Sequence, residues 1–169
     1  MKKFAASMII LILGISVYSQ TDVPKAQSMF IYNFCRFVEW PQSAGGAQFV
    51  IGVLGGNDMV SALTDYTAGK LVGMKPISVK QYKSAADIDN CQILFVAYGK
   101  CGAMKEIVDK VGSNATLIVA EKRSALSEGA GITFVLMDDK LKFELNKANA
   151  TKNGLKLNTK LEEMAYNAK

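Results

Sequence analysis

The stretch Phe-Val-Ile-Gly-Val-Leu-Gly-Gly-Asn-Asp, residues 49–58, decides the fold class of this chain. Its first six residues form an almost unbroken apolar run, which is typical of a strand covered on both faces. The last four turn the chain into a helix that the sequence predicts over residues 59–67, with Asn57 or Asp58 as its N-cap. A buried strand followed directly by a helix indicates an α/β domain.

The chain downstream repeats this alternation of strands and helices. Apolar patterns predict strands over residues 75–81, 93–97 and 115–120, with a helix over residues 104–111 before the last of them. Because strands separated by helices usually pair in parallel, we expect a parallel centre in the sheet. The sequence contains no visible repeat or interdomain linker, which indicates one domain.

The pattern changes near the C-terminus. Residues 132–137 and 141–145 flank a polar turn at residues 138–140, which predicts a hairpin that adds an antiparallel pair at one side of the sheet. A closing helix is expected beyond them, where Thr159 and Glu162 have the spacing of a capping box. The predicted fold class is α/β, a single domain with a mixed, mostly parallel sheet flanked by helices and an antiparallel hairpin near the C-terminus.

An aromatic segment precedes the first strand. Five aromatic residues, including the only Trp, lie within residues 29–41, and the apolar positions of residues 24–39 recur at helical spacing. We expect a helix there whose wide apolar face packs on the sheet. Phe37 and Trp40, at its end, are the candidate partner contacts because large aromatics dominate interface hot spots. The alternative is that both simply seal the core.

The first nineteen residues are typical of a signal peptide. Lys2 and Lys3 precede an apolar run over residues 8–17, and Ser19 suits the last position before a peptidase site. A run of about ten apolar residues is short for a bilayer core of about 30 Å, so an uncleaved anchor is the lesser alternative. We expect cleavage after Ser19 and a secreted domain over residues 20–169.

Charge and composition disfavour several function classes. Without residues 1–19 the chain has 18 basic residues against 15 acidic ones, a net charge of +3, which is too weak to indicate nucleic-acid binding. The sequence contains no His, so the usual nucleophile pairs and histidine metal sites are absent. Acidic pairs such as Asp87 and Asp89 have a local structural explanation as turn and cap residues. We expect no enzyme, no catalytic residues, no metal and no cofactor.

Cys35, Cys91 and Cys101 allow at most one intramolecular disulfide in an oxidising compartment. If Cys91 and Cys101 bracket a strand, that strand spans roughly 20 Å at about 3.3 Å per residue, which is too long for a bridge. That pairing requires the chain to turn back sharply after Tyr98 and Gly99. Buried free thiols are the other reading.

The turn at Gly55, Gly56 and Asn57 is a candidate ligand or anion site, because backbone N–H groups at a helix N-terminus can receive a phosphate. It lacks the third glycine of a dinucleotide-binding fingerprint and the Lys-Ser/Thr pair of a P-loop. Asp58 would also repel an anion. A purely structural turn is the alternative.

Five segments in the same order resemble one known family and cover residues 25–165. They are FIYNFCRFVEWP, FVIGVLGGND, CQILFV, GAGITFVLMDDKLKFELN and GLKLNTKLEEMA. They are similar to the YfiR-like family of bacterial periplasmic regulatory proteins. The resemblance implies an α/β fold and a regulator, typically a homodimer, that binds the sensor region of a membrane-bound diguanylate cyclase and represses it, with effects on cyclic-di-GMP signalling and biofilm.

A second reading remains open beside this one. Open α/β sheets usually bind ligands at the carboxyl ends of their parallel strands, here near residues 55–58 and 98–102. The chain would then be a periplasmic small-ligand-binding domain that serves another membrane sensor.

Overall fold

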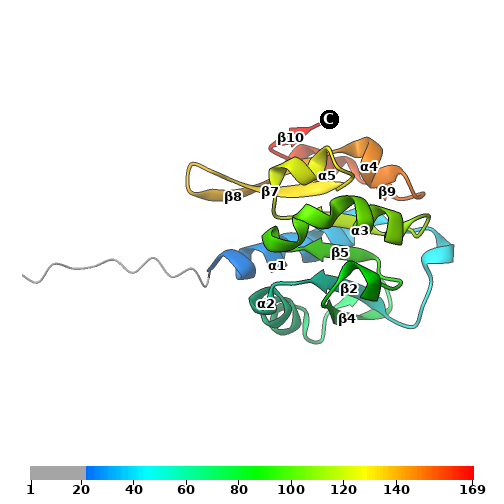
Figure 1. Ribbon diagram of the computed structural model, residues 1–169. Helices are drawn as coiled ribbons and strands as arrows, with labels where there is room; N and C mark the ends of the chain where they lie inside the picture. Colours follow the sequence, from blue (N-terminus) through cyan, green and yellow to red (C-terminus); the bar gives the residue numbers. More distant parts are fainter. Residues whose placement is uncertain (1–21) are drawn as a thin grey trace, which may run out of the picture.

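The computed structural model describes residues 22–169, and the predicted leader and its cleavage site lie outside them (Figure 1). The strands are β1 (Val38–Glu39), β2 (Phe49–Leu54), β3 (Leu71–Val72), β4 (Lys75–Tyr82), β5 (Ile93–Val96), β6 (Leu117–Ala120), β7 (Ile132–Met137), β8 (Lys140–Leu145), β9 (Lys156–Leu157) and β10 (Asn167–Ala168). The α-helices are α1 (Asp22–Phe37), α2 (Asn57–Thr67), α3 (Met104–Val111), α4 (Lys147–Thr151) and α5 (Thr159–Met164). Short 3₁₀ helices cover Gln42–Ala44, Ala85–Asp87, Tyr98–Ala103 and Arg123–Leu126.

Eight strands form one sheet in the order β10-β8-β7-β6-β5-β2-β4-β3. The pairings from β4 through β2, β5 and β6 to β7 are all parallel, whereas β8 is antiparallel to β7 and β3 is antiparallel to β4. This arrangement confirms the predicted mixed, mostly parallel sheet with an antiparallel hairpin near the C-terminus. The small strand β10, parallel to β8 beyond the hairpin, was not predicted.

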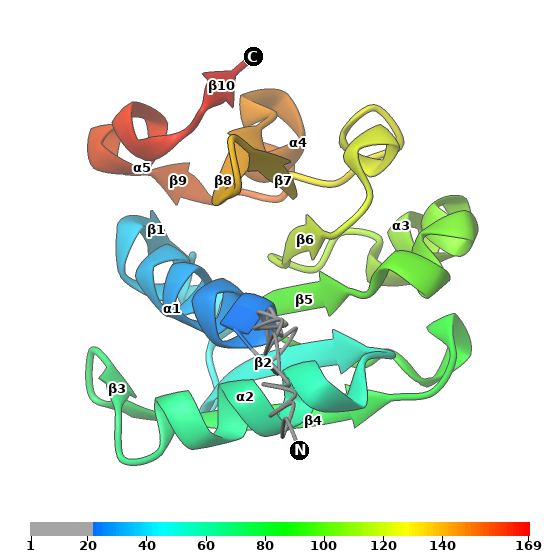
Figure 2. The same ribbon diagram turned by 90° about the vertical axis from the view of Figure 1, so that its left-hand side faces the viewer.

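The central strands are apolar throughout because both of their faces are covered. All residues of β5 and β6 are buried. One face packs on α1, α2 and α5, and the other packs on α3 and the 3₁₀ helices at Ala85–Asp87, Tyr98–Ala103 and Arg123–Leu126, so that α1 and α3 lie on opposite sides of the sheet (Figure 2). The aromatic positions of α1 form the centre of the first layer, where the rings of Phe34 and Phe143 lie 5.0 Å apart, edge to face.

The ends of α1 and α2 differ from the sequence prediction. The first helix begins at Asp22 and ends at Phe37, because the backbone after Phe37 is extended and Val38 pairs with Leu157 in a small antiparallel sheet of β1 and β9. The predicted caps of α2 were wrong. Gly56 is the N-cap with φ 66, in the left-handed region that favours glycine, and the helix already includes Asn57.

In the C-terminal region the structure confirms the predicted hairpin and corrects the predicted helix cap. Asp138 and Asp139 have φ 51 and 57, as a two-residue hairpin turn between β7 and β8 requires. The closing helix α5 is capped by Asn158, whose side-chain oxygen accepts a hydrogen bond from the backbone N–H of Lys160. The predicted cap at Thr159 was therefore wrong by one residue.

Candidate functional site

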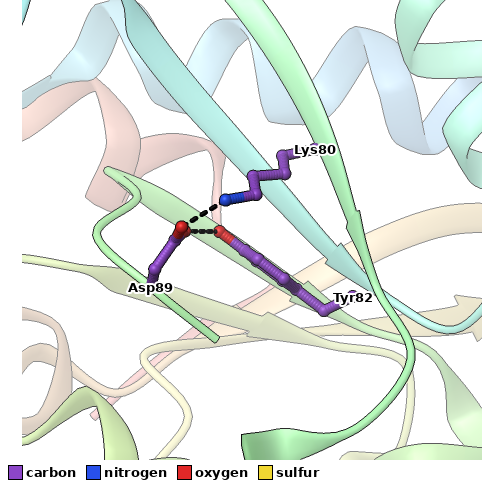
Figure 3. Close-up of polar contacts among 3 residues, drawn as sticks. All are labelled: Lys80, Tyr82 and Asp89. Carbon is purple, nitrogen blue, oxygen red and sulfur yellow. Dashed lines mark hydrogen bonds and ion pairs between the residues drawn. The ribbon is translucent and has the colours of Figure 1, made fainter. Parts of the chain in front are cut away.

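A polar cluster lies on the strand near one edge of the sheet. Lys80 and Tyr82 are two residues apart on β4, so their side chains lie on the same face, and Asp89 comes from the loop before β5 (Figure 3). One carboxylate oxygen of Asp89 accepts from the Lys80 ammonium and the other accepts from the Tyr82 hydroxyl. The Lys80 and Asp89 side chains are about half exposed, whereas Tyr82 is buried.

A glycine on the neighbouring strand makes room for the Tyr82 ring. A Cβ on Gly52 of β2 would lie 2.5 Å from Cε2 of Tyr82, which is closer than such atoms approach, and 3.1 Å from Sγ of Cys91, which is a tight contact. The ring therefore packs over the backbone of Gly52, beside the Cys91 thiol. Only its hydroxyl group reaches the half-exposed carboxylate.

The electrostatics of the cluster fix its protonation at neutral pH. Burial, and then the hydrogen bond to Asp89, raise the pKa of Tyr82 well above its usual value. The hydrogen bonds from Lys80 and Tyr82 lower the pKa of Asp89. Burial raises the pKa of the Cys91 thiol to about 12. The phenol and thiol thus stay protonated and the carboxylate ionised, so these groups make a fixed polar feature rather than an acid–base pair.

The second carboxylate of this region, Asp87, has a local role. Its Oδ2 accepts from the backbone N–H of Ser84 at 2.9 Å and from the Ser84 hydroxyl at 2.8 Å, which caps the short 3₁₀ helix at Ala85–Asp87. Asp87 and Asp89 therefore do not form a pair that could hold a cation together. Sequence reasoning explained Asp89 only as a loop residue, because the contact with β4 depends on strand pairing.

The predicted turn at Gly55, Gly56 and Asn57 lies at the carboxyl end of β2 and is covered by a lysine. The methylene stem of Lys100 passes over Gly55, where a Cβ would lie 2.9 Å from its Cγ, and its ammonium donates to the carbonyl of Lys83 at 2.9 Å. The Asn57 side chain accepts from the Gln81 amide at 2.6 Å. These contacts explain the turn as a structural element.

Phe37 and Trp40, the predicted partner contacts, are both half-buried and pack against the core layer of α1. The Trp40 ring lies edge to face on Phe49, with centroids 4.9 Å apart, and its N–H donates to the carbonyl of Gln92. Trp40 therefore has a structural role at the amino ends of the strands. Phe37 has no polar group and contacts the same layer.

The three cysteines are buried free thiols. Cys35 lies in the core layer on the α1 side, whereas Cys91 and Cys101 lie in the layer on the α3 side. After β5 the chain turns back through the 3₁₀ helix at Tyr98–Ala103, and the Cys101 thiol lies 3.5 Å from the carbonyl of Ala97. The sequence indicated a turn after Tyr98 and Gly99 only as the condition for a bridge between Cys91 and Cys101, and in the structure both of these thiols are free.

Two further hollows occur on the surface, and the first reaches Asp58, directly after the glycine turn. One, of about 770 Å³, lies between α1 and α2 and is lined by Pro24, Lys25, Asp58, Ser61, Ala62, Asp65 and Tyr66. The other, of about 220 Å³, lies at the amino ends of β5 and β6 and includes Gln92 and Asn153. Within residues 22–169, no cluster of three metal-ligating side chains occurs, and no helix is long and apolar enough to cross a membrane.

The fold is shared with solved structures of low sequence identity. A conserved domain protein from Vibrio cholerae superposes with a TM-score of 0.55 at 10% identity, over 87% of this chain and 60% of that one. The ABC domain from Streptococcus pneumonia, solved in complex with L-Trp, gives 0.53 at 12% identity, over 72% of this chain and 55% of that one. The chain thus spans less than two thirds of both structures, and at these identities the likeness concerns the fold alone. A comparison with curated proteins gave no match.

The sheet order and its two helical layers define an α/β domain with a mostly parallel sheet and an antiparallel hairpin at one side. The particular family follows from the sequence: a model of the YfiR/HmsC-like family matches residues 24–166, so the chain belongs to that family. This confirms the resemblance found in the five ordered segments. The YfiR-like family comprises periplasmic regulators of cyclic-di-GMP signalling, which are regulatory rather than catalytic.

Proposed function

We propose that this protein binds the sensor region of an inner-membrane diguanylate cyclase and represses the enzyme by contact. The observation that carries the proposal is the family match over residues 24–166. The site supports it indirectly. The titratable groups around β4 are held in one protonation state by burial and mutual hydrogen bonds, which suits a rigid binding domain better than an acid–base catalyst.

The proposal includes export of the chain by its leader. Residues 1–19 would be removed after Ser19, which leaves Gln20 as the first residue of a periplasmic domain over residues 20–169. N-terminal sequencing of the protein purified from the periplasm should begin at Gln20. A start at Met1 in a membrane fraction would contradict cleavage.

The contact with the cyclase is tested in the cell. Deleting the gene should raise cyclic-di-GMP and biofilm formation, and the full chain supplied from a plasmid should restore both. A matched variant that lacks residues 2–19 should be made but should fail to restore them, because it stays in the cytoplasm. An unchanged level of cyclic-di-GMP after deletion, together with no membrane cyclase co-purifying with the tagged protein, would contradict the proposal.

The surface for the cyclase and the oligomeric state belong to the same proposal. Phe37 remains a candidate contact because it is half-buried and apolar at the end of α1. The family resemblance also implies a homodimer, which sedimentation of the purified domain would show. A chain that sediments as a monomer at every concentration tested would remove the dimer from the proposal.

A further inference from the structure

The strand β4 has an open outer edge over its second half, from Ser78 to Tyr82. It pairs with β2 on one side from Ile77 to Tyr82, whereas on the other side β3 pairs only with Lys75 and Pro76. Within residues 22–169, no strand pairs with the rest of this outer edge, as Figure 2 shows at the lower end of the sheet. Unpaired strand edges are templates for pairing with another chain.

The backbone groups that face outward can be assigned from two hydrogen bonds. The carbonyl of Tyr82 accepts from the N–H of Gly55, so the backbone groups of Tyr82 face β2. The N–H of Ile77 donates to the carbonyl of Lys70 on the other side at 3.4 Å. Because successive residues of a strand alternate in direction, Val79 and Gln81 direct both their N–H and C=O groups outward.

The side chains along this edge carry a strong excess of positive charge. Residues 70–83 contain four lysines, Lys70, Lys75, Lys80 and Lys83, and no acidic residue. Asp89 accepts from Lys80, and Asp87 accepts from the Ser84 hydroxyl, so the two carboxylates of the following loop are already hydrogen-bonded. Ile77 and Val79 pack against the core layer on the α1 side but are only half-buried, so part of each remains as apolar surface for the alternate side chains of an added strand.

These charges distinguish between two possible occupants of the edge, which are a second copy of this chain and an acidic segment of another protein. Antiparallel pairing with a second copy centred on Val79 would direct Lys83 of each copy toward Lys75 of the other, a position where β3 already pairs. A segment without acidic residues offers no compensating ion pairs in other registers. Like charges directly opposite each other destabilise a strand pair. Lysines on an edge strand are a known protection against such self-pairing. The lysines would instead attract an acidic segment.

We infer that the open outer edge of β4, from Val79 to Gln81, docks an extended acidic segment of another protein by strand addition. Backbone hydrogen bonds to Val79 and Gln81 would hold the segment. Its carboxylates would pair with Lys75 and Lys83, and its β-branched side chains would cover Ile77 and Val79. The inference goes beyond the proposed function, because it does not depend on which protein supplies the segment.

The test selects peptides from a phage-displayed library of random twelve-residue sequences on the folded domain. The selected peptides should alternate Asp or Glu with β-branched residues. Val79→Pro should weaken their binding at least tenfold, because it removes an outward N–H, and a proline whose N–H site faces solvent is tolerated on an edge strand. Val79→Thr is the matched control, since it keeps the N–H and should bind like the wild type.

A second variant tests the charges of the edge and does not depend on a proline in the strand. The double substitution Lys75→Glu and Lys83→Glu lies on exposed or half-exposed positions and should weaken the same peptides at least tenfold. Selection of no peptides, selection of peptides without an acidic excess, or binding unchanged by both variants would overturn the inference. So would a dimer of the domain that Val79→Pro converts to a monomer, because a second copy would then occupy the edge.

Discussion

The indole N–H of Trp40 donates a hydrogen bond to the backbone carbonyl of Gln92 at 3.1 Å, although the two residues are fifty-two positions apart in the sequence. The same carbonyl accepts from the N–H of Leu117 at 2.9 Å, and the Gln92 side chain bonds the backbone of Val50 and Ala44. These bonds join the end of the first helical segment to the entries of β2, β5 and β6. Trp40 therefore closes the amino end of the sheet.

Truncating Trp40 should destabilise the domain. Trp40→Phe keeps an aromatic ring near Phe49 but loses the hydrogen bond, so we expect a loss of about 1 kcal/mol. Trp40→Ala also loses the packing and should cost about 3 kcal/mol. Denaturant unfolding of the purified variants measures both. If Trp40→Ala keeps full stability but loses binding to the cyclase, the ring is a partner contact rather than a structural one.

The elements that could be predicted from the sequence are those with a long local pattern. The buried strand at residues 49–54 and the helix at residues 104–111 have the predicted bounds. A strand covered on both faces leaves a continuous apolar run, and an amphipathic helix leaves a period of 3.6 residues, so each has a clear local pattern. The two-residue strands β1 and β9 left none. Each exists only because Val38 meets Leu157 across the fold, a long-range pairing that no local pattern contains.

The candidate site could not be predicted from the sequence for the same reason, because it too depends on long-range contacts. The residues Lys80, Tyr82 and Asp89 are ordinary in the sequence, and their meeting depends on β4 lying beside β2 and on the loop before β5 returning toward it. Gly52 was the one available signal, since an interior glycine in a buried strand indicates the close approach of another group. The lack of His, by contrast, could be read directly.

Gly52→Ala should be strongly destabilising. The new methyl group would lie 2.5 Å from the Tyr82 ring and 3.1 Å from the Cys91 sulfur, and the ring is buried, so neither can move freely. Overpacking of this kind costs about 1–3 kcal/mol. Gly99→Ala is the matched control, because no atom lies within 4 Å of its Cβ position, and it should change stability little. Equal thermal melting temperatures for the two variants would contradict the packing described at Tyr82.

The Asp89 carboxylate should make stability depend on pH in the acid range. Hydrogen bonds from Lys80 and Tyr82 lower its pKa in the folded state, so its contribution is present above the unfolded pKa of about 3.9 and is lost as pH falls through the folded value. Since the pair is half exposed, we expect about 1 kcal/mol or less at pH 7. Unfolding of the wild type and Asp89→Asn from pH 7 to pH 2 should therefore differ at pH 7 and converge below about pH 4.

The control for this pH series is Glu128→Gln, which removes an exposed carboxylate that has no ion-pair partner among residues 22–169. Its unfolding free energy should follow the wild type across the whole range. A difference between wild type and Asp89→Asn that stays constant down to pH 2 would contradict the role of the charged carboxylate.

The three thiols should be unreactive in the folded protein and free in the unfolded one. Cys35, Cys91 and Cys101 are each at most 3% exposed, and burial raises the pKa of Cys91 to about 12, so almost no thiolate forms at pH 8. Ellman's reagent should find no thiol in the native domain and three per chain after denaturation without reductant. Ser113→Cys, at an exposed position after α3, is the positive control and should react at once in the native state. A single thiol in the denatured wild type would mean that two cysteines had formed a disulfide, and the free-thiol arrangement of the core would then be wrong.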